Sequence, residues 1–486
     1  MTNTITIIIG YLRNNLSLLF PISLFLYGGR NVFLPQILQQ DDMKELDIGN
    51  YGVFSCVWYE GDNHPLWSTI IWMVSKTGMP TQTIIVSLNM FLALSSIVLI
   101  YYFLKKKYSI IYAVFGSSIL GNSFMFTYYS SNLKQYQIEI LYSIIALLMY
   151  ERFNNEKKDY YILIPLAIFF ALLSNGTIFI SLLFLLALAM DSIKDKKNLF
   201  LSLLLLAIPG FSIVNKKIAR ISFETYWDEF FINIDSVQGF IKSIYFLFSL
   251  FIKGLFGSSL WQIALLLFSF AFIYSLIKKQ ETFSIVVILS LSLCSILRLY
   301  PLGGGRTDIM FYPFVLCLII NFLNEIKTRG IKDNQKVLPL LILVLASTFI
   351  DSEPIYKKEN INEAVSKVFA HNKDSLILVS DEQYLGFTHY SKKIFGETID
   401  NNNECLKKVV ENTNIYNLKD GYDENLFKKI NLPSDREIWI IGIELEGTRG
   451  SFRLAENYLI KNGYKKNAEH KFDIGIYAIE YSKINN

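Results

Sequence analysis

The sequence predicts a polytopic α-helical membrane protein with a small α/β domain at its C-terminus. Of the 486 residues, 52% are hydrophobic and only 18% are charged, and the apolar residues gather in blocks such as 83–104, 199–214 and 260–277. Uncharged blocks of about 18 residues are long enough to cross the hydrocarbon core of a bilayer. Because backbone amides in hydrocarbon must be paired within their own segment, we expect these blocks to be helices.

About eleven such blocks make residues 1–351 a predicted transmembrane domain. The candidate spans are 11–28, 83–104, 109–127, 136–150, 160–174, 178–190, 198–214, 260–277, 283–299, 309–323 and 337–351. Clusters of Lys and Arg lie between them, and the span count places these clusters on one side of the membrane. That side is predicted to be the cytoplasm. The net charge of +4 therefore reflects topology, and no nucleic acid partner is expected.

This count requires that the apolar segment 237–257 lies in the membrane interface, since a further span would move later lysine clusters to the outer side. Lys242 and Lys253 interrupt the segment, which agrees with an interfacial position. The predicted outer loops are then 29–82, 128–135, 215–240 and 298–308. A composition rich in Ile, Asn and Lys suggests a bacterial source, so we expect a location in the bacterial inner membrane with the functional side extracytoplasmic.

Residues 352–486 differ in composition and predict a soluble extracytoplasmic α/β domain. Strand-like runs alternate with helix-like stretches. The predicted strands are 376–380, 438–442 and 474–481, and the predicted helices are 360–369 and 451–462. No phosphate-binding loop or metal-ligand spacing is present in this part of the sequence.

The first outer loop, 29–82, is too long and too polar for a simple connection. It carries an acidic cluster that includes Asp41, Asp42 and Asp47, followed by His64. Carboxylates just above a bilayer can accept a proton from a sugar hydroxyl or bind a divalent cation. The alternative is that these acids are solvated loop residues and that His64 has a packing role.

The second outer loop, 128–135, contains Lys134 and leads through Gln135 and Tyr136 into the next candidate span. A lysine here runs against the positive-inside trend, and polar residues at the mouth of a span are typical of a wall facing a cavity. We therefore consider Lys134, Gln135 and Tyr136 candidate substrate-binding residues. Snorkelling of Lys134 to lipid headgroups is the alternative.

A third outer loop, 298–308, begins with Arg298 and holds three consecutive glycines before Arg306. Glycines let a backbone approach a ligand closely, and a guanidinium group can offer two parallel hydrogen bonds to a phosphate. Both arginines are therefore candidate substrate-binding residues. A plain turn with an interfacial arginine explains the same pattern.

In this order, the outer segments resemble the GT-C superfamily of membrane glycosyltransferases, and most closely its protein O-mannosyltransferase and lipid A aminoarabinose transferase branch. Asp41-Asp42 and His64-Pro65-Leu66 are similar to the acidic pair and the His-Pro-Pro-Leu-like motif of that group. Segment 130–136 (SSNLKQY) is similar to its SSELKQY motif, and 300–306 (YPLGGGR) to its YPxGGR motif with one extra glycine. The pair Tyr226-Trp227 is similar to a recurring aromatic pair.

Two positions depart from the family pattern. The acidic pair is Asp-Asp where Asp-Glu is usual, with Asp47 as an alternative acid, and Asn132 stands where a glutamate is common. The resemblance covers residues 1 to about 350. It leaves open which carboxylate is essential and what the missing glutamate would have done.

The resemblance implies an enzyme that moves a sugar from a polyprenyl-phosphate-linked donor, a membrane lipid, to an extracytoplasmic acceptor, which is a glycan, a lipid or a protein. It implies Asp41 or Asp42 as the catalytic base, Arg306 and Lys134 as stabilising charges for the departing phosphate, and inversion of the anomeric centre. No cofactor is fixed by it; a divalent cation is a candidate, with unknown ligands.

A lipid-linked sugar flippase or other transporter is the main alternative, and a membrane scaffold that presents the tail is a second. Transporters usually carry charged or helix-breaking residues near mid-span and repeats between their halves. The sequence has no convincing repeat, and its polar residues gather at the outer face. That distribution favours the transferase.

Overall fold

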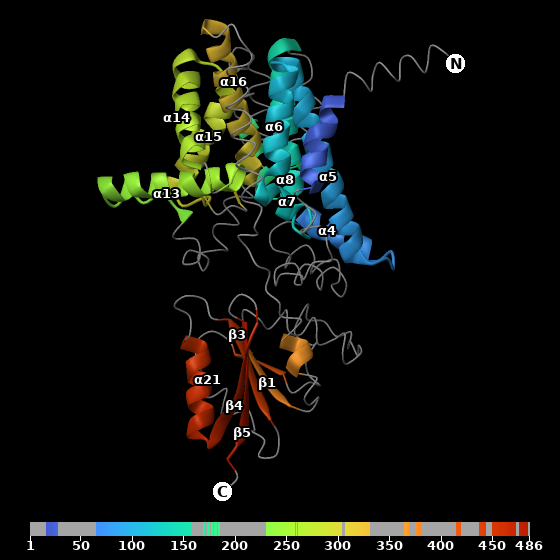
Figure 1. Cartoon of the computed structure of the whole chain (residues 1–486), viewed down its shortest axis with the longest axis vertical. Coiled ribbons are helices and arrows are strands. Elements are labelled where there is room, and N and C mark those ends of the chain that lie inside the picture. The colour runs from blue at the N-terminus through green and yellow to red at the C-terminus, as the bar shows by residue number, and fades with distance from the viewer. Residues whose placement is uncertain are drawn as a thin grey trace, which may run out of the picture. The chain divides into compact units, whose positions relative to one another are not determined.

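The computed structural model of the chain is mostly helical and ends in a mixed β-sheet (Figure 1). It divides into two compact units, of which one contains the helical segments between residues 79 and 353 and the other the strands of 354–486. The structure describes residues 16–27, 65–156, 169–170, 173–174, 176–177, 179–181, 183–184, 230–257, 259, 261–303, 307–330, 364–368, 375–380, 415–418, 437–443, 450–472 and 476–484.

Helices occupy many of the predicted spans. Besides a short apolar helix at Leu16–Tyr27, they are α4 (Pro65–Ser75), α5 (Thr81–Lys107), α6 (Ile110–Asn122), α7 (Phe124–Tyr129), α8 (Tyr136–Glu156), α13 (Val237–Phe256), α14 (Trp261–Lys278), α15 (Thr282–Ile296), the 3₁₀ turn η4 (Ile309–Phe311) and α16 (Tyr312–Gly330). Among the described residues, four helical segments are long and apolar enough to cross a membrane: α5, α13, α14 and the η4–α16 segment Ile309–Ile326. The predicted spans 198–214 and 337–351 lie outside the described residues, and so do most of 160–174 and 178–190.

Two predicted segments differ from the structure. The predicted loop 29–82 contains α4, which starts at Pro65, where the fixed φ of proline suits the first helical turn. The predicted span 109–127 is interrupted at Ser123, whose extended backbone separates α6 from α7. The Ser123 hydroxyl donates a hydrogen bond to the Gly254 carbonyl of α13 at 2.8 Å, which holds the break in place.

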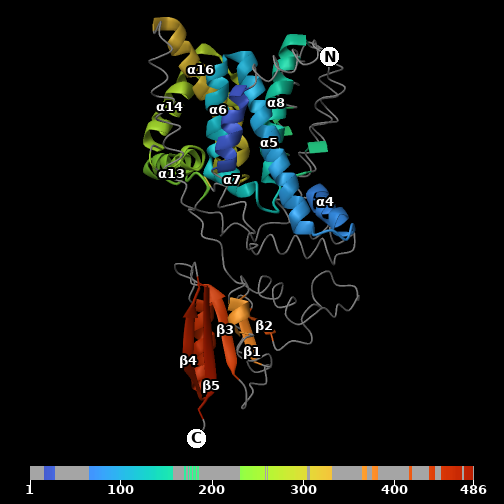
Figure 2. The ribbon, with the colours of Figure 1, turned by 45° about the vertical axis from the view of Figure 1, so that its right-hand side comes forward.

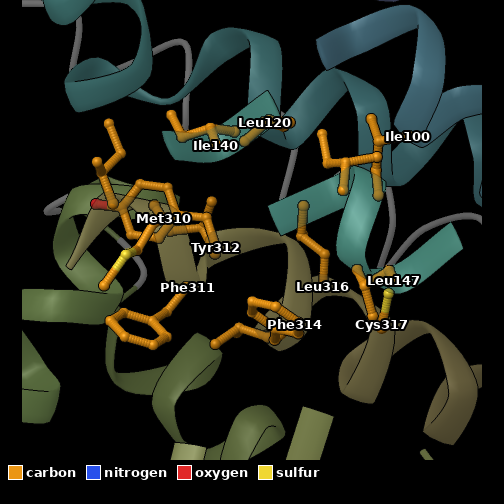
Figure 3. Packing of buried hydrophobic residues seen from close by; sticks show 14 of the residues in the cluster. Ile100, Leu120, Ile140, Leu147, Met310, Phe311, Tyr312, Phe314, Leu316 and Cys317 are labelled. Atoms are coloured by element: carbon orange, nitrogen blue, oxygen red, sulfur yellow. The ribbon is translucent and has the colours of Figure 1, made fainter. Parts of the chain in front are cut away.

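The helical unit is centred on the η4–α16 segment. In its apolar window 78% of the residues are buried, against 22% for α14, as expected for a helix that is hydrophobic on all sides. Figure 3 shows Met310, Tyr312 and Leu316 from this segment facing Ile140 of α8 and Leu120 of α6. The outer face of α14 instead exposes large apolar side chains, which suits contact with lipid.

Helix α13 crosses its neighbours instead of running beside them (Figures 1 and 2). One side of it packs against the bundle through Phe248, which stacks on Phe268 of α14 at 5.9 Å between ring centroids, and through Phe251, whose centroid lies 5.5 Å from that of Tyr312. Its other side leaves Val237, Ile241 and Tyr245 exposed. Although α13 is long enough to span, this crosswise direction agrees with the predicted interfacial position.

The second unit is built on a five-stranded mixed sheet of order β2-β1-β3-β5-β4. Its strands are β1 (Leu376–Ser380), β2 (Ile415–Leu418), β3 (Ile438–Ile443), β4 (Tyr464–Lys471) and β5 (Ile476–Lys483). Strand β1 pairs in parallel with β2 and β3, and β5 pairs antiparallel with β3 and β4.

Helix α21 (Gly450–Lys461) covers the sheet. Its Ala455 and Leu459 share a buried cluster with Leu378, Ile440 and Ile479 of the central strands. The predicted strands 376–380 and 438–442 are confirmed, the predicted strand 474–481 is confirmed over its described part from residue 476, and the predicted helix 451–462 corresponds to α21. Residues 364–368 are helical within the predicted 360–369. Strands β2 and β4 were not predicted.

Candidate functional site

The turn that carries Lys134 joins α7 to α8. Helix α7 ends at Tyr129, and two serine hydroxyls then donate back to backbone carbonyls of its last turn. Ser130 donates to the Thr127 carbonyl at 2.6 Å and Ser131 to the Tyr128 carbonyl at 2.9 Å. The backbone amides of Ser130 and Ser131 donate to the same two carbonyls, so the hydroxyls reinforce the turn that follows α7.

Buried side chains from two other helices fix the backbone of this turn. The Asn89 amide of α5 donates to the carbonyls of Asn132 at 2.6 Å and Lys134 at 2.9 Å. The Trp67 indole of α4 donates to the Leu133 carbonyl at 2.9 Å. Three consecutive carbonyls are therefore held by side chains, which gives the turn a defined position next to the segment that follows His64.

The three candidate residues of this turn have different surroundings. Gln135 is buried, while Lys134 and Tyr136 are half-buried. The Tyr136 ring packs against Tyr129 with 4.5 Å between centroids. Lys134, Gln135 and Tyr136 therefore lie together at the start of this helix, and their role as a wall for a substrate stays a prediction.

Glu139 lies one turn further into α8 and was not predicted as a site residue. It is 2% exposed, and its carboxylate accepts a short hydrogen bond from the Ser174 hydroxyl. A Cβ at Gly176 would lie 2.8 Å from the Glu139 carboxylate and 2.5 Å from the Met310 sulfur, so the 174–177 turn is wedged between α8 and η4. A carboxylate within an apolar run of sequence was the signal that could have identified it.

The segment after α15 is folded back on itself by buried hydrogen bonds. The Tyr300 hydroxyl donates to the Thr307 carbonyl at 2.5 Å, and the Gly303 amide donates to the Asp308 carboxylate at 2.7 Å. Asp308 is fully buried, whereas Arg298 is exposed and adopts a positive φ of 54°. The described part of this segment is therefore a compact hairpin whose two sides are tied together.

Gly303 is required by the packing of this hairpin. Its φ is +83°, and a Cβ there would lie 2.8 Å from the Leu247 carbonyl of α13. Both the left-handed backbone and the close approach favour glycine. Gly303 thus lies directly against the backbone of α13.

The start of α8 and the hairpin share one neighbourhood. The Tyr300 ring stacks on Phe179 at 5.6 Å and lies 6.3 Å from the Phe311 ring. Burial raises the pKa of the Tyr300 phenol well above its ordinary value, and the nearby charges of Glu139 and Asp308 raise it further. Tyr300 therefore keeps its proton and serves as a hydrogen-bond donor at neutral pH.

Several predicted site residues lie outside the described residues: Asp41, Asp42, Asp47, His64 and Arg306. The segment 226–227 does so as well. Within the described part of the chain, no group of three or more His, Cys, Asp or Glu side chains could hold a metal ion. The acids for which a divalent cation was considered are among the residues outside it.

The described residues form a polar region at one end of the helical unit. Trp67, the Lys134 turn and the Tyr300–Asp308 hairpin come from the three segments singled out in the sequence, and hydrogen bonds or charge interactions link each to the start of α8 or to the turn before it. The donors of Trp67, Asn89 and Tyr300 are used to fix the backbone, so Lys134 is the group at this end that can attract a phosphate. When the chain is compared with protein-family models and with curated protein sequences, no family and no curated protein matches.

Proposed function

We propose that this protein is a GT-C-type membrane glycosyltransferase that moves a sugar from a polyprenyl-phosphate-linked donor to an extracytoplasmic glycan, lipid or protein acceptor. The observation that carries the proposal is the convergence of Trp67, the Lys134 turn and the Tyr300–Asp308 hairpin at one end of the helical unit. These belong to the segments on which the family resemblance rests. The proposal includes about eleven spans, with this end on the outer face of a bacterial inner membrane.

In the proposed reaction, an acceptor hydroxyl oxygen attacks the anomeric carbon of the donor sugar. The bond from that carbon to the phosphate oxygen breaks, the electron pair leaves with the phosphate, and the hydroxyl proton passes to a carboxylate of Asp41 or Asp42. Attack opposite the leaving phosphate inverts the anomeric centre. Asp47, His64 and Arg298 would bind or orient the substrates.

Positive charge on the departing phosphate is the second requirement. We assign it to Arg306 and Lys134, with Gln135 and Tyr136 lining the same wall. The support for Lys134 is its half-buried position on a turn whose carbonyls are held by Asn89 and Trp67. These bonds fix the backbone from which the Lys134 side chain extends, and a positive charge near the departing phosphate stabilises the developing negative charge.

One observation favours the flippase alternative. Glu139 is a buried carboxylate in a predicted span, and ionisable residues inside membranes often mark substrate or proton pathways. A flippase would move the intact lipid-linked sugar across a sealed vesicle membrane. Only the transferase forms a new glycosidic bond in detergent, where no two compartments exist.

The test is an assay of purified protein in detergent with a labelled polyprenyl-linked sugar and a cell-envelope extract as acceptor source. Wild type should consume donor and label an acceptor. Asp41→Asn, Asp42→Asn and Arg306→Ala are assayed separately. The assignment is supported if Arg306→Ala and at least one of the two carboxylate variants lose transfer activity. Unchanged transfer by all three variants would remove these roles, and donor movement in vesicles without transfer in detergent would favour the flippase.

A further inference from the structure

A second candidate binding site lies at the opposite end of α5, α8 and α15 from the polar site. A cavity of about 290 Å³ opens between the last turns of α5 and α8 and the first turn of α15. This volume is at the small end of the range for ligand pockets, roughly 300–1,000 Å³, so it suits a headgroup better than a large ligand. Charged and aromatic side chains line it, and the proposed transfer reaction uses none of them.

The cavity contains one cation and two carboxylates. The Lys107 ammonium pairs with the Glu281 carboxylate at 2.6 Å, and the Tyr108 hydroxyl donates to the same carboxylate at 2.7 Å. Glu281 therefore has its charge compensated. Glu151 lines the same cavity and lies close enough to Lys107 to interact with its charge, but among the described residues its carboxylate forms no hydrogen bond or ion pair of its own. The cavity as a whole thus carries an excess negative charge.

The backbone at the start of α15 supports a functional role. Lys279 and Glu281 adopt positive φ values of 55° and 50°, which are unfavourable for residues other than glycine. Left-handed conformations of this kind are strained and concentrate at ligand sites and switch regions. Here the strained turn places the Glu281 carboxylate in the cavity wall beside Lys107.

The rest of the wall is aromatic. Tyr150 and Phe283 stack with 4.7 Å between ring centroids and an interplanar angle of 15°, and Phe103 lies below the Lys107 ammonium at 5.5 Å. Aromatic faces attract ammonium groups, and a neighbouring carboxylate strengthens that preference. Close to the lining residues in sequence are three exposed cations at the ends of α5, α8 and α14, namely Lys106, Arg152 and Lys278, and cations near the membrane surface attract phosphate groups.

We propose that this cavity binds the headgroup of an aminophospholipid. The primary ammonium sits between Glu151 and the Tyr150–Phe283 pair, and the phosphate faces the lysines and arginine at the helix ends. An anionic headgroup without an amine would bring negative charge to the unpaired Glu151 and be disfavoured. The site is independent of the proposed transferase activity and would tie α5, α8 and α15 together at this end.

The proposal is tested by binding to the full chain purified in detergent. Short-chain phosphatidylethanolamine should bind at least tenfold more tightly than the matching phosphatidylglycerol, and Glu151→Gln should reduce the phosphatidylethanolamine affinity at least tenfold. Glu325→Gln is the matched control, because Glu325 accepts a hydrogen bond from Tyr274 outside the cavity. It should bind as wild type does.

Two results would overturn the site. One is equal affinity of wild type for the two lipids, and the other is unchanged binding by Glu151→Gln when native thermal stability shows that this variant is folded. Free phosphoethanolamine serves as a third probe: affinity equal to that of the lipid would show that the ligand is a soluble amine phosphate and would contradict a lipid site.

Discussion

Asn89 shows how one buried amide holds the proposed donor site in shape. Its amide nitrogen serves two carbonyls of the Lys134 turn, and both would lose a donor if the side chain were removed. A buried polar group left without a partner costs about 1–3 kcal/mol. The position of Lys134 therefore depends on a residue in α5 that never needs to touch a substrate.

Asn89→Ala should lower the stability of the helical unit by about 2–4 kcal/mol and reduce transfer, because it leaves two buried carbonyls unsatisfied. Ser87→Ala on the same helix is the control, since Ser87 is exposed and donates only to the Thr83 carbonyl one turn earlier. Thermal unfolding in detergent measures both. Equal midpoints for the two variants would show that the Asn89 bonds contribute nothing.

Gly303 gives a second prediction at this scale. Gly303→Ala should destabilise by more than the roughly 1 kcal/mol expected for a left-handed alanine, because its Cβ would also meet the Leu247 carbonyl. Gly78→Ala isolates the backbone part, since Gly78 has φ +72° and no atom lies within 4 Å of the place that a Cβ would take. The difference between the thermal unfolding midpoints of the two variants measures the cost of the contact between the new Cβ and the Leu247 carbonyl. No difference would contradict the packing of the hairpin on α13.

Sequence reasoning singled out Lys134, Gln135 and Arg298 as candidates, because a polar residue at the mouth of an apolar span stands out; their functional roles stay predictions. It missed Glu139, Asn89 and Asp308, whose roles come from partners far away in the sequence, such as Ser174 for Glu139. A single carboxylate in an apolar run signals burial but does not reveal which turn will supply its hydrogen bond.

At the scale of elements, length and hydropathy predicted helices well and strands less well. The blocks 83–104 and 260–277 correspond to α5 and α14 with ends shifted by a few residues. Strand β4 was missed because its sequence YKKNAEHK is polar and most of its side chains are exposed, as is common at a sheet edge protected by lysines. Helix α4 was missed because it lies within 29–82, a segment that was interpreted as a loop from its polar and acidic residues.

Labelling of the two ends of α13 can decide whether this helix lies in the membrane interface or spans the membrane. Val237 and Lys253 are 16 positions apart in the sequence, about 24 Å along a helix at 1.5 Å per residue, enough to approach both faces if α13 spanned. In the interfacial position, Val237→Cys and Lys253→Cys should both react with a membrane-impermeant maleimide from the same side of intact cells. Reaction from opposite sides would make α13 a span and reverse the sidedness of every later loop.

At the scale of the whole molecule, the sheet unit has the features of an independently folding domain. It has its own buried cluster, formed by β1, β3, β5 and α21, and the Tyr481 hydroxyl donates to the Glu456 carboxylate at 2.5 Å across it. A domain with its own core can fold without the rest of the chain. Its change in composition and its alternating strand-like and helix-like runs predicted an α/β class, but the strand order depends on pairing between distant segments, which the sequence does not show.

Residues 354–486 expressed alone should therefore be soluble and unfold cooperatively by circular dichroism. The complementary deletion, ending at residue 353, should remain in the membrane. If the tail recognises the acceptor, this truncated protein should keep its thermal stability and lose transfer; if the tail is a cap, stability should fall first. Aggregation of the isolated fragment under all conditions would contradict an independent core.

The central claim is that the acidic first loop, the Lys134 turn and the Arg298–Asp308 hairpin share one extracytoplasmic site. Single cysteines at Asp42, Lys134 and Arg298 in a cysteine-free background, each probed with a membrane-impermeant maleimide on intact cells, test it most directly. All three should react from outside, while Lys106→Cys should react only after permeabilisation. Reaction of Asp42→Cys and Arg298→Cys from opposite faces of the membrane would contradict the shared site and the transferase with it.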